Sequence, residues 1–353
     1  MTRKSYLFKV IFLVSSIILA NCNINDSVEQ ATQKNQSLNS FEKIADVEWG
    51  KPKGFSLTMD IYVPNTEKSS FPVLVILHGG GWLINNKSIM NQMSEYIVQH
   101  SEYIVCNVNY RLLGDNGNTT MMNEIVEDVL GAVLWVKVNI GKYNGDPTKI
   151  AVTGDSAGGH LAAMIVNSGN RLESKGFDGP TLGFNPTYLP QGKSTEDIIK
   201  EGGLEVQAAN LSYGAFDMYA ACLGGLEKAG NYFWAFSGNI PRGIFGNEFS
   251  VQKNPDMYKA VSPIYNIPNI SERKLPPQLA IVGTLDNLIT PASVQNYVSK
   301  IKESGQSIEY WEHEGRPHAF LDSGKNDYLG INFEDDAPPA LNRMIQFLDS
   351  VFN

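Results

Sequence analysis

The sequence Gly154-Asp155-Ser156-Ala157-Gly158 has the residue pattern of a nucleophilic serine. An apolar run at residues 150–153 precedes it, and a helix-compatible segment at residues 156–167 follows. In a strand–turn–helix context, G-x-S-x-G forms a sharp turn that exposes the serine oxygen at the edge of a sheet. A chain with 32 glycines can produce this spacing by accident, so the interpretation depends on the matching context on both sides. We predict that Ser156 is a nucleophile for acyl transfer.

A second glycine-rich stretch, His78-Gly79-Gly80-Gly81-Trp82, follows an apolar run at residues 71–77. Acyl transfer needs backbone N–H groups that point at the developing oxyanion, and consecutive glycines let a backbone approach a ligand closely. Ala157, the residue after the nucleophile, supplies a further donor in such sites. The alternative is a glycine loop that only permits tight turning, which its position upstream of the serine motif disfavours. We expect His78 to support this loop.

The general base is expected among the histidines that follow the serine. Where this serine motif is catalytic, the triad runs serine, acid, histidine along the chain, which leaves His313 and His318 beyond the serine's own helix. His313 falls at the end of a predicted strand, whereas His318 lies in a loop at residues 315–320. Because catalytic residues concentrate in loops on a rigid scaffold, we favour His318. His160 is expected to pack or to hydrogen-bond within its own helix.

The acid that orients the imidazole is expected to be Asp286. It follows an apolar run at residues 278–282, and open α/β sheets build their sites at the carboxyl ends of such strands. Asp217, after the preceding predicted strand, is a weaker candidate and is expected to be structural. Asp322 stands too close behind the histidine, and we expect it to be solvated.

The rest of the sequence alternates strand-like and helix-like segments. Strand-like segments, of which residues 71–77 are a continuous apolar run, predict strands at residues 43–49, 55–63, 71–77, 103–109, 150–153, 206–211, 278–282 and 308–311. Helical spacing of apolar residues and helix-compatible stretches predict helices at residues 88–100, 121–140, 156–167, 291–304 and 338–351. This alternation predicts an α/β fold with a mostly parallel central sheet and helices on both faces, in one domain at residues 41–353.

Two segments break this alternation. Residues 168–205 are rich in glycine and proline, and residues 216–263 are rich in aromatic side chains. Structureless loops of this length are uncommon in a compact domain, so we predict two functional insertions over the active site. The aromatic residues of the second insertion, from Tyr219 to Phe249, either bury part of a substrate or form the private core of the insertion.

The N-terminus has the features of an export signal. Arg3, Lys4 and Lys9 precede an uncharged run at residues 10–20, which suits a signal peptide and is too short to span a bilayer. The sequence Leu19-Ala20-Asn21-Cys22 resembles a bacterial lipobox, with Asn21 in place of a smaller residue. We therefore expect a signal peptide at residues 1–22, lipidation of Cys22, and a flexible tether at residues 23–40. The chain would be exported to the periplasm or cell surface and held to a membrane only by this anchor. The alternative is simple secretion.

Charge and composition exclude several classes of protein. The formal net charge of −9 and the sequence pI near 5.1 argue against a nucleic-acid partner, which would require clustered Lys and Arg. The five histidines and three cysteines lack zinc-like spacing, so we expect neither a metal nor another cofactor. Cys106 lies in an apolar run and is expected to be a buried thiol, without a disulfide to Cys222.

Several motifs together resemble those of a known family. They lie at residues 78–82, 109–112, 154–161, 262–263, 283–286 and 315–320. They resemble the carboxylesterases of the hormone-sensitive-lipase-like and feruloyl/acetyl-esterase-like branches of the α/β hydrolases, over about residues 43–351. The resemblance implies an α/β-hydrolase fold, oxyanion donors at Gly80, Gly81 and Ala157, and the triad Ser156, Asp286 and His318. Residues 114–122 and 168–205 depart from the family pattern where substrate pockets are usually shaped, which leaves the substrate open.

The resemblance implies ester hydrolysis through an acyl-enzyme, without a cofactor. We expect short-chain acyl or aryl esters as substrates, because the insertions would narrow the pocket. A small-molecule ester would be the partner. An arylformamidase or a small-peptide hydrolase on the same fold is the alternative, because the triad does not separate these reactions. A non-catalytic binding module is disfavoured, because the predicted nucleophile, acid, base and glycine loop are all present.

Overall fold

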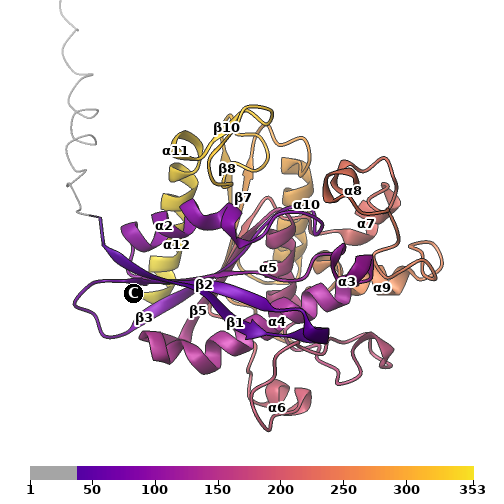
Figure 1. Cartoon of the computed structure of the whole chain (residues 1–353), viewed down its shortest axis with the longest axis horizontal. Coiled ribbons are helices and arrows are strands. Elements are labelled where there is room, and N and C mark those ends of the chain that lie inside the picture. Colours follow the sequence, from indigo (N-terminus) through magenta and orange to yellow (C-terminus); the bar gives the residue numbers. More distant parts are fainter. Residues whose placement is uncertain (1–37) are drawn as a thin grey trace, which may run out of the picture. The chain divides into compact units, whose positions relative to one another are not determined.

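A central eight-stranded sheet organises residues 38–353, the part of the chain that the computed structural model describes (Figure 1). Its strands are β1 (Phe41–Gly50), β2 (Leu57–Pro64), β3 (Phe71–Leu77), β4 (Ile104–Val108), β5 (Gly145–Asp155), β6 (Ala208–Ser212), β7 (Gln278–Gly283) and β8 (Ile308–His313). The order is β1-β2-β4-β3-β5-β6-β7-β8. The pairs β1–β2 and β2–β4 are antiparallel, and all the others are parallel. This confirms the predicted mostly parallel sheet. The predicted signal peptide and the tether up to residue 37 lie outside the described residues.

Five long helices cover the two faces of the sheet (Figure 1). They are α2 (Asn91–His100), α4 (Met122–Asn139), α5 (Ala157–Ser168), α10 (Pro291–Glu303) and α12 (Pro338–Phe352). On one face α2 packs beside α12, where the Tyr96 hydroxyl lies 2.9 Å from Asn342 Oδ1. On the other, α5 packs between α4 and α10, and Asn167 Nδ2 lies 3.0 Å from the Tyr297 hydroxyl. All five agree with the predicted helices to within a few residues.

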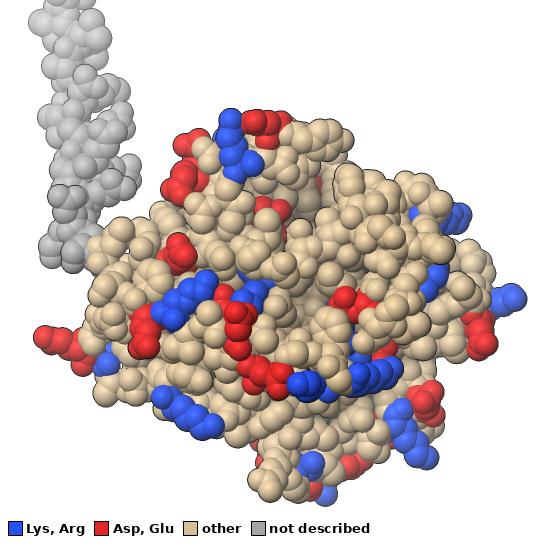
Figure 2. Space-filling model, viewed as in Figure 1, with Lys and Arg blue, Asp and Glu red and all other residues tan. Residues whose placement is uncertain are grey.

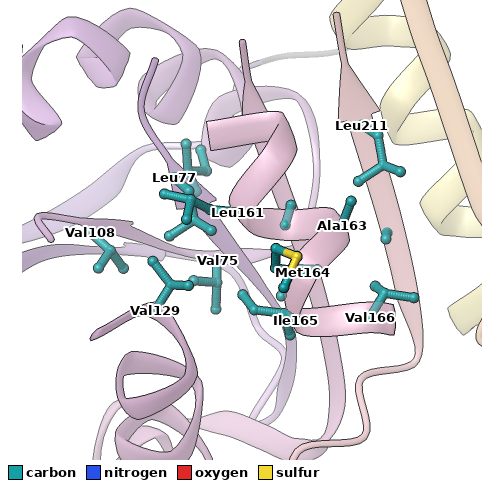
Figure 3. Close-up of a cluster of buried hydrophobic side chains, with 14 of the residues drawn as sticks. Val75, Leu77, Val108, Val129, Leu161, Ala163, Met164, Ile165, Val166 and Leu211 are labelled. Atoms are coloured by element: carbon teal, nitrogen blue, oxygen red, sulfur yellow. The ribbon is translucent and has the colours of Figure 1, made fainter. Parts of the chain in front are cut away.

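The core beneath the site forms between β3, α4 and α5. Every residue of α5 is buried, and β3 is buried along almost its whole length, as expected for a parallel strand covered on both faces. Figure 3 shows Val75 and Leu77 of β3 beside Leu161 and Met164 of α5 and Val129 of α4. This packing fixes the amino end of α5, and therefore Ser156, against the end of β3.

Contrary to the prediction, the first insertion, residues 168–205, lies away from the active site. It contains the short helix α6 (Thr195–Lys200) and packs on α4 (Figure 1). There the Asn185 backbone N–H donates to Glu127 Oε1 at 3.1 Å, and the Thr187 hydroxyl donates to the Asp128 carboxylate. The chain leaves α5 at the end opposite Ser156, which directs the insertion away from the site.

The second insertion, residues 216–263, contains α7 (Met218–Leu223), α8 (Tyr232–Ser237) and α9 (Pro255–Ala260). Several of its aromatic residues form a core of the insertion itself, one of the two roles considered for them. Trp234, Phe245 and Tyr258 are buried within it, and the rings of Phe245 and Tyr258 meet edge to face at 5.1 Å. Phe233 instead packs on the glycine loop after β3. This insertion therefore reaches the predicted site.

Smaller elements complete the described chain. The helices α3 (Asp115–Asn118) and α11 (Phe333–Asp336) and the short strand pair β9 (Lys325–Asn326) and β10 (Ile331–Asn332) were not predicted. Within residues 38–353, no helix has the length and apolar character that a membrane span would need.

Candidate active site

Ser156 sits in a strained turn between β5 and α5. Its φ of 51° and ψ of −114° are unusual for a residue with a side chain, and such strain clusters at functional sites. The flanking glycines are required by close packing. A Cβ atom on Gly154 would stand 2.3 Å from the carbonyl carbon of Gly158, and one on Gly158 would stand 1.9 Å from the Leu77 oxygen. The elbow can therefore press against the end of β3 only with glycine at both positions.

The structure brings Ser156, His318 and Asp286 into one hydrogen-bonded row. His318 Nε2 lies 3.0 Å from Ser156 Oγ, and His318 Nδ1 lies 2.7 Å from Asp286 Oδ2. The buried Asp286 follows β7, and its Oδ1 accepts the backbone N–H groups of Leu288 at 2.9 Å and Ile289 at 2.8 Å. These bonds fix the carboxylate, which in turn fixes the imidazole. The arrangement is that of a serine activated by an oriented base.

The glycine loop after β3 packs directly on the elbow. Gly80 and Gly81 have φ values of 121° and 59°, which turn the chain back so that the Leu83 and Ile84 N–H groups bond to the Gly80 oxygen. The N–H groups of Gly80 and Gly81 donate to no other group in residues 38–353. Ala157 is the first residue of α5, where a helix leaves its N–H groups unpaired. These three donors are free to bind an oxyanion.

Two buried histidines support the loop. The Trp82 indole N–H donates to His160 Nδ1 at 3.1 Å, and His160 Nε2–H donates to the Val261 oxygen at 2.7 Å. Burial lowers the pKa of both His78 and His160 to about 4, so each ring is neutral. His78 Nδ1 bonds to the Gly79 oxygen, as expected of a supporting residue. The bonds of His160 leave its helix, which corrects the prediction that they stay within it.

A buried ion pair anchors the loop after β4. Arg111 donates from Nε to Asp128 Oδ2 at 2.8 Å and from Nη2 to Asp128 Oδ1 at 2.7 Å. Two residues on, the Leu113 N–H donates to the Trp82 oxygen at 2.8 Å. The pair thus connects α4, through the loop after β4, to the glycine loop. Bidentate geometry of this kind is specific to arginine.

The other candidate residues lie apart from the catalytic row. His313, at the end of β8, bonds through Nε2 to the Asp336 oxygen at 2.8 Å. Asp217 accepts the Ala220 N–H and caps α7, so it is structural as predicted. Asp322 is half-buried rather than fully solvated. Burial, followed by the nearby charge of Asp155, raises its pKa well above the usual range. Cys106 and Cys222 are buried free thiols.

Asp155 is a site residue that the sequence reasoning did not single out. Its carboxyl lies beneath the oxyanion loop, where a Cβ atom on Gly79 would stand 2.3 Å from Asp155 Oδ2. Asp155 Oδ1 is buried and has no hydrogen-bond partner in the described part of the chain. Burial raises the pKa of Asp155 to about 6. Its position beside the nucleophile was the only signal in the sequence.

This buried carboxyl predicts a pH-dependent gain in stability for Asp155→Asn. Because the folded-state pKa of about 6 exceeds the unfolded value of 3.8, ionised Asp155 destabilises the fold increasingly as pH rises from about 4 to above 6. The neutral amide lacks this cost. We expect the variant to unfold with a free energy on the order of 1–3 kcal/mol higher than wild type at pH 8, and with a gain of about a third of that at pH 4.5. Urea unfolding at both pH values measures it.

The exposed Asp178 provides the matched control, and Asp178→Asn should behave like wild type at both pH values. A gain for Asp155→Asn that is equal at pH 4.5 and pH 8, or a loss at pH 8, would contradict the assigned titration.

Comparisons with known proteins found a matching family and several similar esterases. A model of the BD-FAE family matches residues 59–301. The chain is similar to esterase LipQ of Mycobacterium tuberculosis, with 28% identity over 276 residues, 74% of this chain and 55% of that protein. The chain spans about half the length of the curated relatives it matches.

Two solved structures show the same fold. One is esterase Est2 of Thermogutta terrifontis with propionate bound, which has a TM-score of 0.59 and 22% identity and covers 89% of this chain and 94% of that one. The other is a truncated carbohydrate esterase from gut microbiota, with a TM-score of 0.62, 20% identity, and coverage of 89% and 97%. The fold is that of the α/β hydrolases, as the sequence motifs implied.

Proposed function

Because the chain belongs to the BD-FAE family, we propose that it is a serine carboxylesterase that hydrolyses short-chain acyl or aryl esters. The observation that carries this proposal is the row Ser156–His318–Asp286, with distances of 3.0 and 2.7 Å, beside a loop of unpaired backbone donors. A nucleophile, an oriented base and an oxyanion site are the groups that acyl transfer needs.

The mechanism follows from these positions. His318 Nε2 accepts the proton of Ser156 Oγ as the oxygen attacks the ester carbonyl carbon. The carbonyl oxygen becomes an oxyanion, which the N–H groups of Gly80, Gly81 and Ala157 stabilise. His318 then protonates the leaving alcohol, and an acyl-enzyme remains on Ser156. Water, deprotonated by His318, releases the acid by the same route. Asp286 holds the imidazole in the required tautomer throughout.

The substrate preference is tested with p-nitrophenyl esters from acetyl to decanoyl. We expect kcat/KM to fall steeply beyond about butanoyl, because a narrow pocket cannot enclose further methylenes, and each buried methylene would contribute about 0.8 kcal/mol. N-formylkynurenine and a dipeptide anilide are assayed beside them, and faster turnover of either would favour a formamidase or a peptidase. Specificity constants that stay flat or rise toward decanoyl would contradict the short-chain proposal.

The location of the enzyme is also a proposal. The lipobox-like sequence that ends at Cys22 supports export and membrane anchoring through a lipidated cysteine, and 18 residues separate Cys22 from Phe41, where β1 begins. In a bacterium that processes lipoproteins, wild type should incorporate labelled palmitate and partition into detergent, whereas Cys22→Ser should do neither. Equal partitioning of the two proteins would indicate simple secretion instead.

A further inference from the structure

The aromatic ring of Phe233 lies directly over the oxyanion loop. A Cβ atom on Gly81 would stand between 2.7 and 2.9 Å from three atoms of this ring. Gly81 is therefore constrained twice, by its φ of 59° and by the ring that occupies the space of a side chain. The two residues are 152 positions apart in the sequence, so only the fold places an aromatic group against this donor.

The helix α8 holds this ring in place. The Asn231 side chain accepts the Phe233 N–H at 2.9 Å and caps the helix. The next residue, Trp234, is buried and donates from Nε1 to the Leu226 oxygen at 2.8 Å. On the outer side, the Tyr232 ring packs against Phe233 with centroids 4.5 Å apart. Phe233 itself is half-buried, so the ring contacts the loop while part of it remains exposed.

The surroundings of α8 suit an apolar group. Figure 2 shows few charged side chains over α8, while a band of Lys, Arg, Asp and Glu crosses the face over β1 and β2. Tyr232 and Phe236 are exposed on this helix, and the exposed side chains of Leu285 and Leu288 flank the acid Asp286. Exposed apolar residues that gather in one place mark a surface that binds an apolar partner.

We infer that Phe233 is a specificity-determining residue that limits the length of the acyl group, an inference that rests on the proposed esterase function. In the tetrahedral intermediate, the leaving oxygen must face His318 Nε2, because that nitrogen supplies its proton. The acyl substituent is then directed away from the imidazole and along the oxyanion loop that Phe233 covers. A short acyl group fits beneath the ring, and a longer one meets it.

Because the ring packs on Gly81, we expect it also to shield the Gly81 N–H from water. A hydrogen-bond donor acts more strongly on a developing charge where water is excluded. Removal of the ring should therefore lower activity on the shortest ester while it admits longer ones. Lower activity on the short ester together with higher activity on the long ester would indicate a role in specificity, because a general loss of structure would lower both.

The test compares kcat/KM for p-nitrophenyl acetate, butanoate and octanoate. Phe233→Ala should raise the octanoate-to-acetate ratio at least about tenfold, since the four methylenes beyond butanoyl gain apolar contact. Phe233→Leu should give an intermediate ratio, and Phe233→Trp should lower the butanoate-to-acetate ratio below that of wild type. Phe236→Ala is the matched control: it changes the same residue type on the same helix, where Phe236 is 67% exposed, and should leave the ratios unchanged.

Two outcomes would overturn the inference while the esterase proposal stands. One is that both Phe233→Ala and Phe233→Leu fold and hydrolyse the three esters with the same kcat/KM ratios as wild type. The other is a change confined to the alcohol, measured with methyl, phenyl and p-nitrophenyl butanoates, which would place the ring on the leaving-group side. A wild-type protein that hydrolyses none of these esters contradicts the proposed function itself.

Discussion

Ser156→Ala should reduce kcat on p-nitrophenyl acetate by about four orders of magnitude or more, the loss typical when a catalytic serine is removed. The fold should remain intact, because the substitution adds no atoms to the strained turn and removes only the oxygen that bonds to His318. Kinetics with p-nitrophenyl acetate and a thermal unfolding curve measure the two properties. A fluorophosphonate probe should label wild type at Ser156 and leave the variant unlabelled.

The exposed Ser271 serves as the control, and Ser271→Ala should keep both the activity and the labelling. A Ser156→Ala protein that retains more than about a tenth of the wild-type rate would exclude Ser156 as the nucleophile.

His318→Ala should lose nearly as much activity as the serine variant, because the members of a triad act as a unit. His313→Ala should lose less than about tenfold. The two histidines are five positions apart but have different partners. His318 joins Ser156 Oγ to Asp286, while His313 bonds to the Asp336 backbone and packs its ring against Phe320 at 5.1 Å. His313 therefore acts on the site only by supporting the loop that carries His318.

Both histidine variants are assayed on p-nitrophenyl acetate, and circular dichroism checks that each remains folded. The reverse order of effects, with His313→Ala inactive and His318→Ala nearly normal, would show that the base had been assigned to the wrong histidine.

The strands and long helices could be predicted because their signals are local. A fully buried parallel strand such as β3 is a continuous apolar run, and an amphipathic helix such as α4 repeats its apolar residues at helical spacing. The short elements escaped prediction for the same reason. The helices α6, α7, α8 and α9 have six residues each, too few for a period to show.

The wrong placement of the first insertion has a geometric cause. Glycine and proline content showed that residues 168–205 are irregular, but the surface they cover depends on the direction of α5 and on partners in α4. The partial burial of Asp322 was missed for a similar reason, because it depends on elements distant in the sequence.

By itself, the sequence determined the groups available for chemistry and their order along the chain: the glycine loop, Ser156, Asp286 and His318 each follow a predicted strand. Since the carboxyl ends of parallel strands meet at one edge of a sheet, that order already implied one site. Only the tertiary structure decided what surrounds it. Three features show this: the burial of Asp155, the Arg111–Asp128 pair, and the ring of Phe233 over Gly81. Each depends on contacts between segments that are separated in the sequence, and no local sequence pattern signals them. Such contacts depend on packing and on the exclusion of water, which exist only once the chain has folded.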